Sequence, residues 1–176
     1  MARDARLESD ILGALRAAPD FPQPGVMFQD VAPLMADGAL FARIVDALAA
    51  PFADRVDKVA GIESRGFTFG APVALDLGVG FVPLRKRGKL PGPTFHESYR
   101  LEYGEASLEA QRSAFAPGER VLVVDDVLAT GGTAGAALRL VERCGATVAG
   151  FAFALEISAL GGRARLDAPA TILAVV

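Results

Sequence analysis

One stretch of the chain, VLVVDDVLATGGT at residues 121–133, constrains the fold more than any other. Its first four residues, 121–124, follow a Pro-Gly turn signal and have the length and β-branching of a buried parallel strand. Asp125 and Asp126 come directly after this strand, and apolar residues beyond the glycines repeat at helical spacing as far as Gly145. The sequence therefore predicts a strand, an acidic pair, a glycine loop and a helix, in that order.

The glycines of this stretch lie where the helix begins, and this position indicates a phosphate site. A helix N-terminus offers unpaired backbone N–H groups and the positive end of the helix dipole, and Gly131 and Gly132 have no side chains to keep a phosphate away. Two adjacent carboxylates would repel a polyphosphate, but they accept hydrogen bonds from sugar hydroxyls. We infer a ribose 5-phosphate whose hydroxyls lie on Asp125 and Asp126.

Other kinds of glycine loop fit the sequence less well. The chain contains neither GxxxxGK[ST] nor GxGxxG, so neither a P-loop nor a Rossmann dinucleotide site is indicated. The alternating carboxylates of a calcium loop are absent as well. On the local pattern alone, a polar strand-to-helix turn without a ligand remains the alternative.

The rest of the chain reads as helices alternating with strands, which is typical of an α/β protein. Leu7, Ile11, Ala14, Leu15 and Ala18 form one face of an N-terminal helix that ends at Pro19. The other expected elements are a helix capped by Asp37, strands at 59–62, 79–84, 99–103, 147–155 and 171–176, a helix at 69–77 and a helical turn at 161–166. Residues 88–98 have no apolar period, so we expect a mobile loop there.

A second strand-loop-helix unit and a basic run accompany the first unit. Glu63–Gly66 follows the strand at 59–62, and two polar loops at the carboxyl ends of parallel strands define a ligand crevice. Arg85, Lys86 and Lys89, with Arg87 between them, follow the strand at 79–84. Such a run is often a solvated face or a nucleic-acid patch, but beside this crevice it favours a small polyanion such as pyrophosphate.

At these residues the chain resembles a known family. VVDDVLATGGT is similar to the signature that binds phosphoribosyl pyrophosphate (PRPP) in type I phosphoribosyltransferases, in the form found in members that act on adenine. FPQPGVMFQD, GIESRGFTFGAPVAL, RKRGKLPG and LEYG also match, and the resemblance runs from about residue 21 to about residue 166. It implies one domain over residues 1–176 with a mainly parallel central sheet flanked by helices, an N-terminal hood at 21–34, a flexible flap at about 87–104 and a PRPP loop at 125–133.

The resemblance also implies roles for particular residues. Phe28 would stack on adenine while backbone groups of Met27 and Gln29 read its edge, although an arginine is common in the family where this chain has Gln29. Glu102 would be the catalytic residue, beside N7 of the purine, and the Glu63-Ser64 peptide bond would be cis. The expected PRPP and AMP ligands are Arg65, Arg85, Lys86, Lys89, Asp125, Asp126, Ala129, Thr130, Gly131, Gly132 and Thr133, and the expected adenine ligands are Val26, Met27, Phe28 and Gln29.

The implied reaction is the transfer of the phosphoribosyl group from PRPP to adenine, giving AMP and pyrophosphate in purine salvage. Mg²⁺ would arrive on PRPP without a direct protein ligand, and the enzyme would be a homodimer. Two alternatives stay open: a phosphoribosyltransferase for hypoxanthine, orotate or uracil, and a non-catalytic regulator that binds PRPP. A DNA-binding regulator needs a basic reading element, and the roughly 20 residues before the hood carry too little charge for one.

Composition and charge limit the protein class further. A chain of 176 residues with 52% apolar content suits one domain with a proper core, and its uncharged runs are shorter than the roughly 20 residues of a membrane helix. The formal charge of −3 argues against broad nucleic-acid binding. Cys144 is the only cysteine, so no intrachain disulfide is expected. The first residues lack the apolar core of a signal peptide, so we expect a cytoplasmic protein that binds no membrane.

Overall fold

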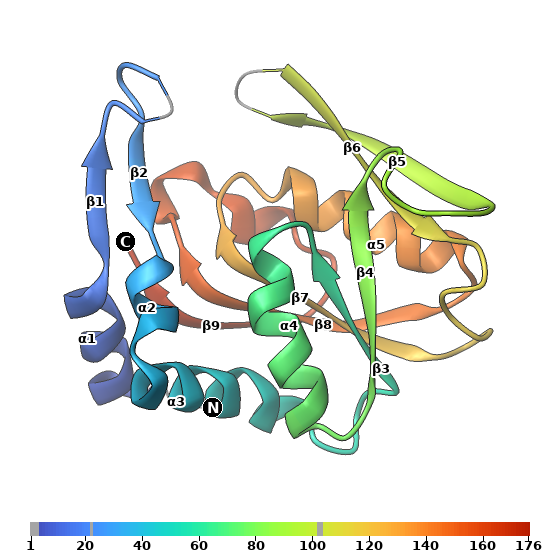
Figure 1. Ribbon diagram of the computed structural model, residues 1–176, viewed down its shortest axis with the longest axis horizontal. Helices are drawn as coiled ribbons and strands as arrows, with labels where there is room; N and C mark the ends of the chain where they lie inside the picture. Colours follow the sequence, from blue (N-terminus) through green and yellow to red (C-terminus); the bar gives the residue numbers. More distant parts are fainter. Residues whose placement is uncertain (1–3, 22, 102–103) are drawn as a thin grey trace.

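A single large sheet organises the computed structural model, which describes residues 4–21, 23–101 and 104–176 (Figure 1). Among these residues the sheet has seven strands in the order β5-β6-β4-β3-β7-β8-β9. Its strands are β3 (Lys58–Ile62), β4 (Gly80–Lys86), β5 (Thr94–Leu101), β6 (Gly104–Gln111), β7 (Arg120–Leu128), β8 (Thr147–Glu156) and β9 (Ala170–Val175). The strands from β4 to β9 in this order are parallel, whereas β6 pairs antiparallel with both β4 and β5. The predicted α/β class with a mainly parallel sheet is therefore confirmed.

Helices cover both faces of the sheet. They are α1 (Ala5–Ala14), α2 (Ala32–Ala36), α3 (Gly38–Ala49), α4 (Arg65–Asp76) and α5 (Gly132–Arg143), with short 3₁₀ turns η1 (Ala50–Phe52), η2 (Ser158–Leu160) and η3 (Gly162–Arg165). Side chains of β7 alternate between the two faces: Leu122 and Val124 pack with α1 to α4, and Val121 and Val123 pack with α5. Both faces of the strand are thus buried, which explains why its sequence is a continuous apolar run.

The N-terminal segment differs from the predicted helix. The helix α1 ends at Ala14, and the next residues form β1 (Arg16–Pro19), which pairs antiparallel with β2 (Met27–Asp30) in a separate two-stranded sheet. A short alanine-rich segment such as this one can form either the last turn of a helix or a strand. Here its pairing with β2 determines that a strand forms. Of the predicted hood at 21–34, the structure describes β2, the residues around it and the start of α2, and we call β1 and β2 together the hood hairpin.

The predicted loop at 88–98 is partly a strand. Thr94 already pairs with Gln111, so β5 and β6 form a long antiparallel hairpin that covers most of the predicted flap. The sequence pattern did not indicate the first part of this strand, because its residues are charged and polar. A hairpin at a sheet edge need not alternate strictly between apolar and polar residues. In Figure 1 the strands of this hairpin and of the hood hairpin both lie toward the top of the view.

The strand β7 continues past its apolar residues through the acidic pair to Leu128. On one side it pairs with β8 along this whole length, but its pairing with β3 ends at Val124. Asp125 and Asp126 therefore lie beyond the part of β7 that pairs with β3, near the point where the chain of β3 turns away into Glu63–Gly66. This leaves both polar loops at one edge of the sheet, as the sequence predicts.

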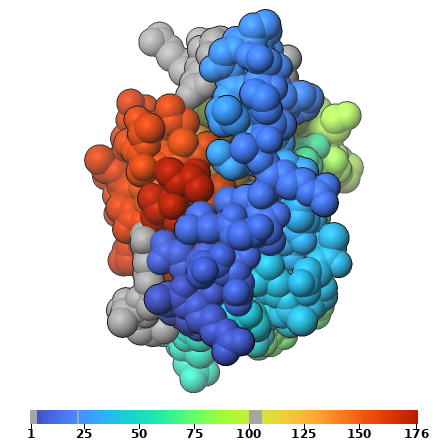
Figure 2. Space-filling view, turned by 90° about the vertical axis from the view of Figure 1, so that its left-hand side faces the viewer, coloured from blue at the N-terminus to red at the C-terminus, as the bar shows by residue number. Residues whose placement is uncertain are grey.

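The first helix lies beside the last strand. The helix α1 packs against β9, and Figure 2 shows this part of the chain beside the C-terminal strand on one face of the molecule. The Ser158 N–H donates a hydrogen bond to the Val176 carbonyl at 2.9 Å, which ties the loop after β8 to the end of β9. Within the described ranges, no helix is both long and apolar enough to span a bilayer.

Candidate functional site

The glycine loop after β7 presents a helix N-terminus, as predicted. The helix α5 begins at Gly132, and Gly131 before it has φ +80°, a conformation that favours glycine. The Thr130 Oγ1 accepts a hydrogen bond from the Gly132 N–H at 3.5 Å, and the Gly131 carbonyl accepts one from the Gly135 N–H at 2.9 Å. The remaining first-turn N–H groups point along the helix axis, where an anion is stabilised by them and by the helix dipole.

The acidic pair lies beside this loop, largely out of water. Asp126 is 4% exposed, and within the described part of the chain its Oδ2 takes no hydrogen bond. The Arg65 Nε lies 2.8 Å from this oxygen but not in hydrogen-bond geometry, so the contact is an ion pair. Burial is the main cause that raises the pKa of Asp125 well above its usual value, and the negative charge of Asp126 is the second cause. A buried carboxylate oxygen without a donor is suited to a ligand hydroxyl.

Arg65 connects the acidic pair to the hood. It follows the Glu63-Ser64 peptide bond, which is cis, and it opens α4 directly after β3. Besides its contact with Asp126, its guanidinium lies 5.1 Å from the centre of the Phe28 ring. The sequence placed these three residues in separate motifs, and the fold brings them into one chain of contacts.

The hood presents an aromatic ring toward this centre. Phe28 packs edge to face on Phe21 at 5.0 Å between ring centres. Met27 and Gln29 flank Phe28 on β2 and lie opposite Pro19 and Ala17 in the β1–β2 ladder. The Phe28 ring beside the Arg65 guanidinium is a surface on which a flat heterocycle can stack.

Two carboxylates shape the basic run: Glu63 of the predicted polar loop, and Glu109, which the sequence analysis did not single out. The Glu63 Oε2 accepts hydrogen bonds from the Arg85 Nε at 3.1 Å and from the Lys86 N–H at 2.8 Å. The Glu109 Oε1 accepts from the N–H groups of Lys89 and Leu90, both at 2.8 Å. The backbone is thereby fixed on both sides of the turn, while the lysine side chains stay exposed. A signal for Glu109 was present, since it is a single charge between apolar residues of β6.

The hairpin strand β5 reaches the phosphate loop through Tyr99. Burial raises the pKa of Tyr99, the charge of Asp125 adds to this rise, and a hydrogen bond with Thr133 opposes it in part. The side chain of Tyr99 packs on the α5 side of the core. The predicted flap therefore contacts the predicted PRPP loop, whereas Glu102, the predicted catalytic residue, lies outside the described residues.

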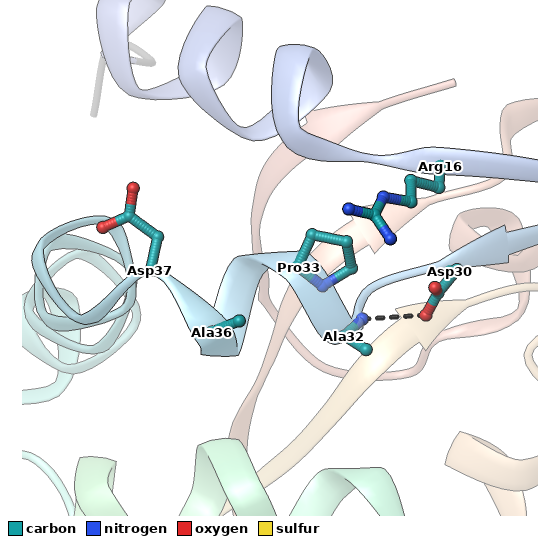
Figure 3. A pocket seen from close by; sticks show the side chains of 6 residues that line it. All are labelled: Arg16, Asp30, Ala32, Pro33, Ala36 and Asp37. Atoms are coloured by element: carbon teal, nitrogen blue, oxygen red, sulfur yellow. Dashed lines mark hydrogen bonds between the residues drawn. The ribbon is translucent and has the colours of Figure 1, made fainter.

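A hollow lies elsewhere, at the base of the hood. It has a volume of about 570 Å³ and is lined by Arg16, Asp30, Ala32, Pro33, Ala36 and Asp37 (Figure 3). The Asp30 Oδ1 in this hollow accepts a hydrogen bond from the Ala32 N–H at 2.9 Å, so that carboxylate has a structural role at the start of α2. None of the predicted site residues lines this hollow, and we assign it no ligand.

Comparison with known proteins gives a consistent result. Residues 34–173 match the family of the phosphoribosyl transferase domain. The chain is 57% identical over 155 residues, 88% of each protein, to an adenine phosphoribosyltransferase of Acidothermus cellulolyticus. Among solved structures, the adenine phosphoribosyltransferase of Rhodothermus marinus is 46% identical with a TM-score of 0.93, covering 98% of this chain and all of that one. The enzyme of Saccharomyces cerevisiae, solved with an imino-altritol bisphosphate and adenine, is 41% identical over 96% of this chain and 99% of that one, with a TM-score of 0.91.

Proposed function

The chain belongs to the phosphoribosyltransferase family, in the branch that acts on adenine, and from this premise we propose how its residues carry out the transfer. The enzyme moves the phosphoribosyl group from PRPP to adenine and forms AMP and pyrophosphate. The bond between the ribose C1 and the pyrophosphate oxygen breaks, and a bond between C1 and the purine N9 forms with loss of the N9 proton. This reaction salvages a free purine base as a nucleotide.

We assign the ribose 5-phosphate to the loop at 125–133. Its 5-phosphate would accept hydrogen bonds from the N-terminal amides of α5, with Thr130 and Thr133 beside it. Its hydroxyls would donate to Asp125 and Asp126, and the donor-free Oδ2 of Asp126 supports this assignment. The pair of carboxylates also offsets positive charge that develops on the ribose as the leaving group departs.

We assign the pyrophosphate to the turn at 63–66 and the basic run. Arg65 is already paired with the acid that would hold the ribose, so it lies at the junction of sugar and leaving group. Lys86 and Lys89 are exposed and project from a backbone that Glu63 and Glu109 hold in place. Several fixed cations stabilise a departing polyanion without reorganising during the reaction.

We assign adenine to the hood, with Phe28 as its stacking surface. The edge-on support from Phe21 and the approach of Arg65 hold the ring in place. Val26, Met27 and Gln29 would contact the base, and recognition through the backbone of Met27 and Gln29 does not depend on the arginine that is common in the family at the position of Gln29. The flap would close over both substrates and exclude water, and Glu102 would handle or orient the proton at N7.

The residues of the proposed site are compatible with Mg²⁺ that arrives bound to PRPP. Across the described ranges, no three His, Cys, Asp or Glu side chains gather into a metal-binding group. The donor-free oxygen of Asp126 lies on the ribose side, where a hard cation on PRPP could be held through water or a hydroxyl. When bound, Mg²⁺ would neutralise charge on the pyrophosphate. A homodimer and a cytoplasmic location complete the proposal, which involves neither nucleic acid nor membrane.

The contact chain from Phe28 through Arg65 to Asp126 is the observation that carries this assignment, since it links base, leaving group and sugar. To test it, the protein would be supplied with Mg²⁺ and PRPP and offered adenine, hypoxanthine, orotate and uracil in turn. We expect nucleotide from adenine alone. Nucleotide from another base would favour a different transferase, and tight PRPP binding without product from any base would favour a regulator. Loss of turnover in Glu102→Leu with unchanged PRPP affinity would support the role of Glu102.

A further inference from the structure

Glu156 and Arg163 form an ion pair that the proposed reaction does not use. Glu156 is the last residue of β8 and is 6% exposed. Its Oε2 accepts hydrogen bonds from the Arg163 Nε at 3.0 Å and from the Arg163 Nη2 at 2.5 Å. Two donors on one oxygen of a buried carboxylate fix the guanidinium in one orientation.

The pair closes a short turn that is also held by its neighbours. Between its two members run η2, Gly161 and the start of η3. The Ile157 N–H donates to the Leu128 carbonyl at 2.9 Å, and the Ser158 N–H donates to the end of β9. The first half of the turn is thus attached to β7 and β9 by the backbone, while the second half depends on the side chain of Arg163.

The second half of the turn touches the phosphate loop directly. A Cβ at Gly162 would lie 2.1 Å from the Ala129 carbonyl oxygen and 3.0 Å from the Gly131 nitrogen. A Cβ at Gly131 would in turn lie 2.8 Å from the Gly162 carbonyl oxygen. Both glycines are therefore required by a backbone-to-backbone contact, and the phosphate loop rests on the turn.

We propose that the Glu156–Arg163 pair is a positioning device for the phosphate loop. By holding Gly162 in place, the pair sets the path of residues 129–131 and hence the direction of the amides that receive the 5-phosphate. Small errors in the direction of such donors reduce binding strongly, because hydrogen bonds to an anion depend on distance and angle. The inference rests on the proposed function only for the identity of the sugar phosphate.

The test compares variants of the pair with matched changes far from the loop. Arg163→Met removes the ion pair, Arg163→Lys keeps the charge with fewer donors, and Gly162→Ala inserts the forbidden Cβ. Arg120→Met is the control for the arginine variants, since Arg120 makes a similar ion pair with Asp57 at the opposite end of β7. Gly13→Ala, in α1 with open space around its Cβ position, is the control for the glycine variant.

Ribose 5-phosphate binding measured by calorimetry is the primary readout, because it needs no turnover. We expect Arg163→Met and Gly162→Ala to weaken it about tenfold or more, Arg163→Lys to weaken it less, and both controls to leave it within about twofold. In steady-state assays the KM for PRPP should rise while the KM for adenine changes by less than about twofold.

Wild-type affinity for ribose 5-phosphate in Arg163→Met would overturn the inference, and so would a parallel rise of both KM values that follows the loss of thermal stability. Should Gly162→Ala fail to fold, the arginine series still decides. If the unmodified protein transfers nothing to adenine, the proposed function fails, while the comparison of sugar phosphate affinities continues to test the positioning role.

Discussion

At the scale of single residues, Asp125 and Asp126 differ in what they contact although they are neighbours. The Asp126 side chain is buried against Arg65, whereas the Asp125 Oδ1 accepts a hydrogen bond from the Asp126 N–H at 2.9 Å. The first arrangement leaves the Asp126 Oδ2 ion-paired but, within the described residues, without a hydrogen bond, so it can accept one from a ligand, and the second fixes the backbone between the two residues. Two neighbouring acids are expensive to bury without a cation or a ligand, so their position here indicates a role in function over stability.

Replacing the acids should abolish catalysis. Asp126→Asn, and the double variant with Asp125→Asn, should lower turnover at least about a hundredfold, because an amide offers less negative charge to the ribose and one of its two heteroatoms cannot accept. Turnover measured with saturating PRPP and adenine checks this, with the exposed Asp76→Asn at the end of α4 as the control. Near-normal turnover in the double variant would refute the ribose assignment.

The raised pKa of Asp125 predicts a stability effect with a definite sign. Above the usual Asp value of 3.8 the unfolded chain gives up this proton readily, while the folded site holds it, so the folded state loses stability as the pH rises. The ligand-free Asp125→Asn variant should therefore melt at a higher temperature than the wild type near pH 7, with a smaller difference near about pH 4. Asp46→Asn, on the exposed face of α3, serves as the control. A melting-temperature difference for Asp125→Asn that stays constant with pH would contradict this cause.

At the scale of elements, the β5–β6 hairpin is attached to the helix that begins at the phosphate loop. Glu97 on β5 accepts hydrogen bonds from Arg139 at 3.2 Å and from Arg143 at 2.5 Å, both on α5. The Arg143 guanidinium also lies 4.9 Å from the Phe95 ring centre. These contacts attach residues 95–97 of the hairpin to α5.

Weakening this attachment should loosen the hairpin base. In Glu97→Gln the charge that attracts both arginines is lost, and the backbone amides of residues 94–99 should exchange with deuterium faster than in the wild type, by about threefold or more. Exchange in the hood strands β1 and β2 should stay the same and provides the internal control. Unchanged exchange in β5 would show that apolar packing alone holds the hairpin.

At the scale of the whole molecule, lowered carboxylate pKa values make the fold sensitive to acid. Hydrogen bonds from Arg120 lower the pKa of Asp57 to about 2, and a hydrogen bond from Arg143 lowers the pKa of Glu97. Burial alone would raise the pKa of Glu63 and of Glu109, but hydrogen bonds lower both: from the Lys86 N–H and the Arg85 side chain for Glu63, and mainly from backbone N–H groups for Glu109. Each of these groups stabilises the fold above its unfolded pKa, and this stabilisation is lost as the pH falls through the lower folded value.

The melting temperature should accordingly fall as the pH is lowered below about 4.5, the usual value for glutamate. The raised pKa of Asp125 has the opposite effect on stability, but Asp125 is a single group, whereas four carboxylates have lowered pKa values. A series of melting curves between about pH 7 and pH 3 in constant salt measures the sum of these effects. A melting temperature that stays level or rises toward pH 3 would mean that these four carboxylate contacts do not outweigh the opposite effect of Asp125.

The local part of the architecture could be read from the sequence. The strand at Val121–Val124, the helix after Thr133, the cap at Asp37 and the second loop after β3 were all predicted near their observed positions. Hydrophobic period, capping residues and glycine placement are properties of neighbouring residues, so they can be recognised without knowledge of the fold. The same local signals named the acids and glycines whose chemistry suits a sugar phosphate.

What the sequence could not determine depends on residues far apart in the chain. The strand β1 forms because β2 lies beside it, and the contact of Phe28 with Arg65 joins the hood to a loop of another motif. Likewise, Gly162 supports the phosphate loop only because β8 runs next to β7 and ends at Glu156. Spacing along the chain specifies which groups a segment carries, but strand order and helix packing decide which of them meet.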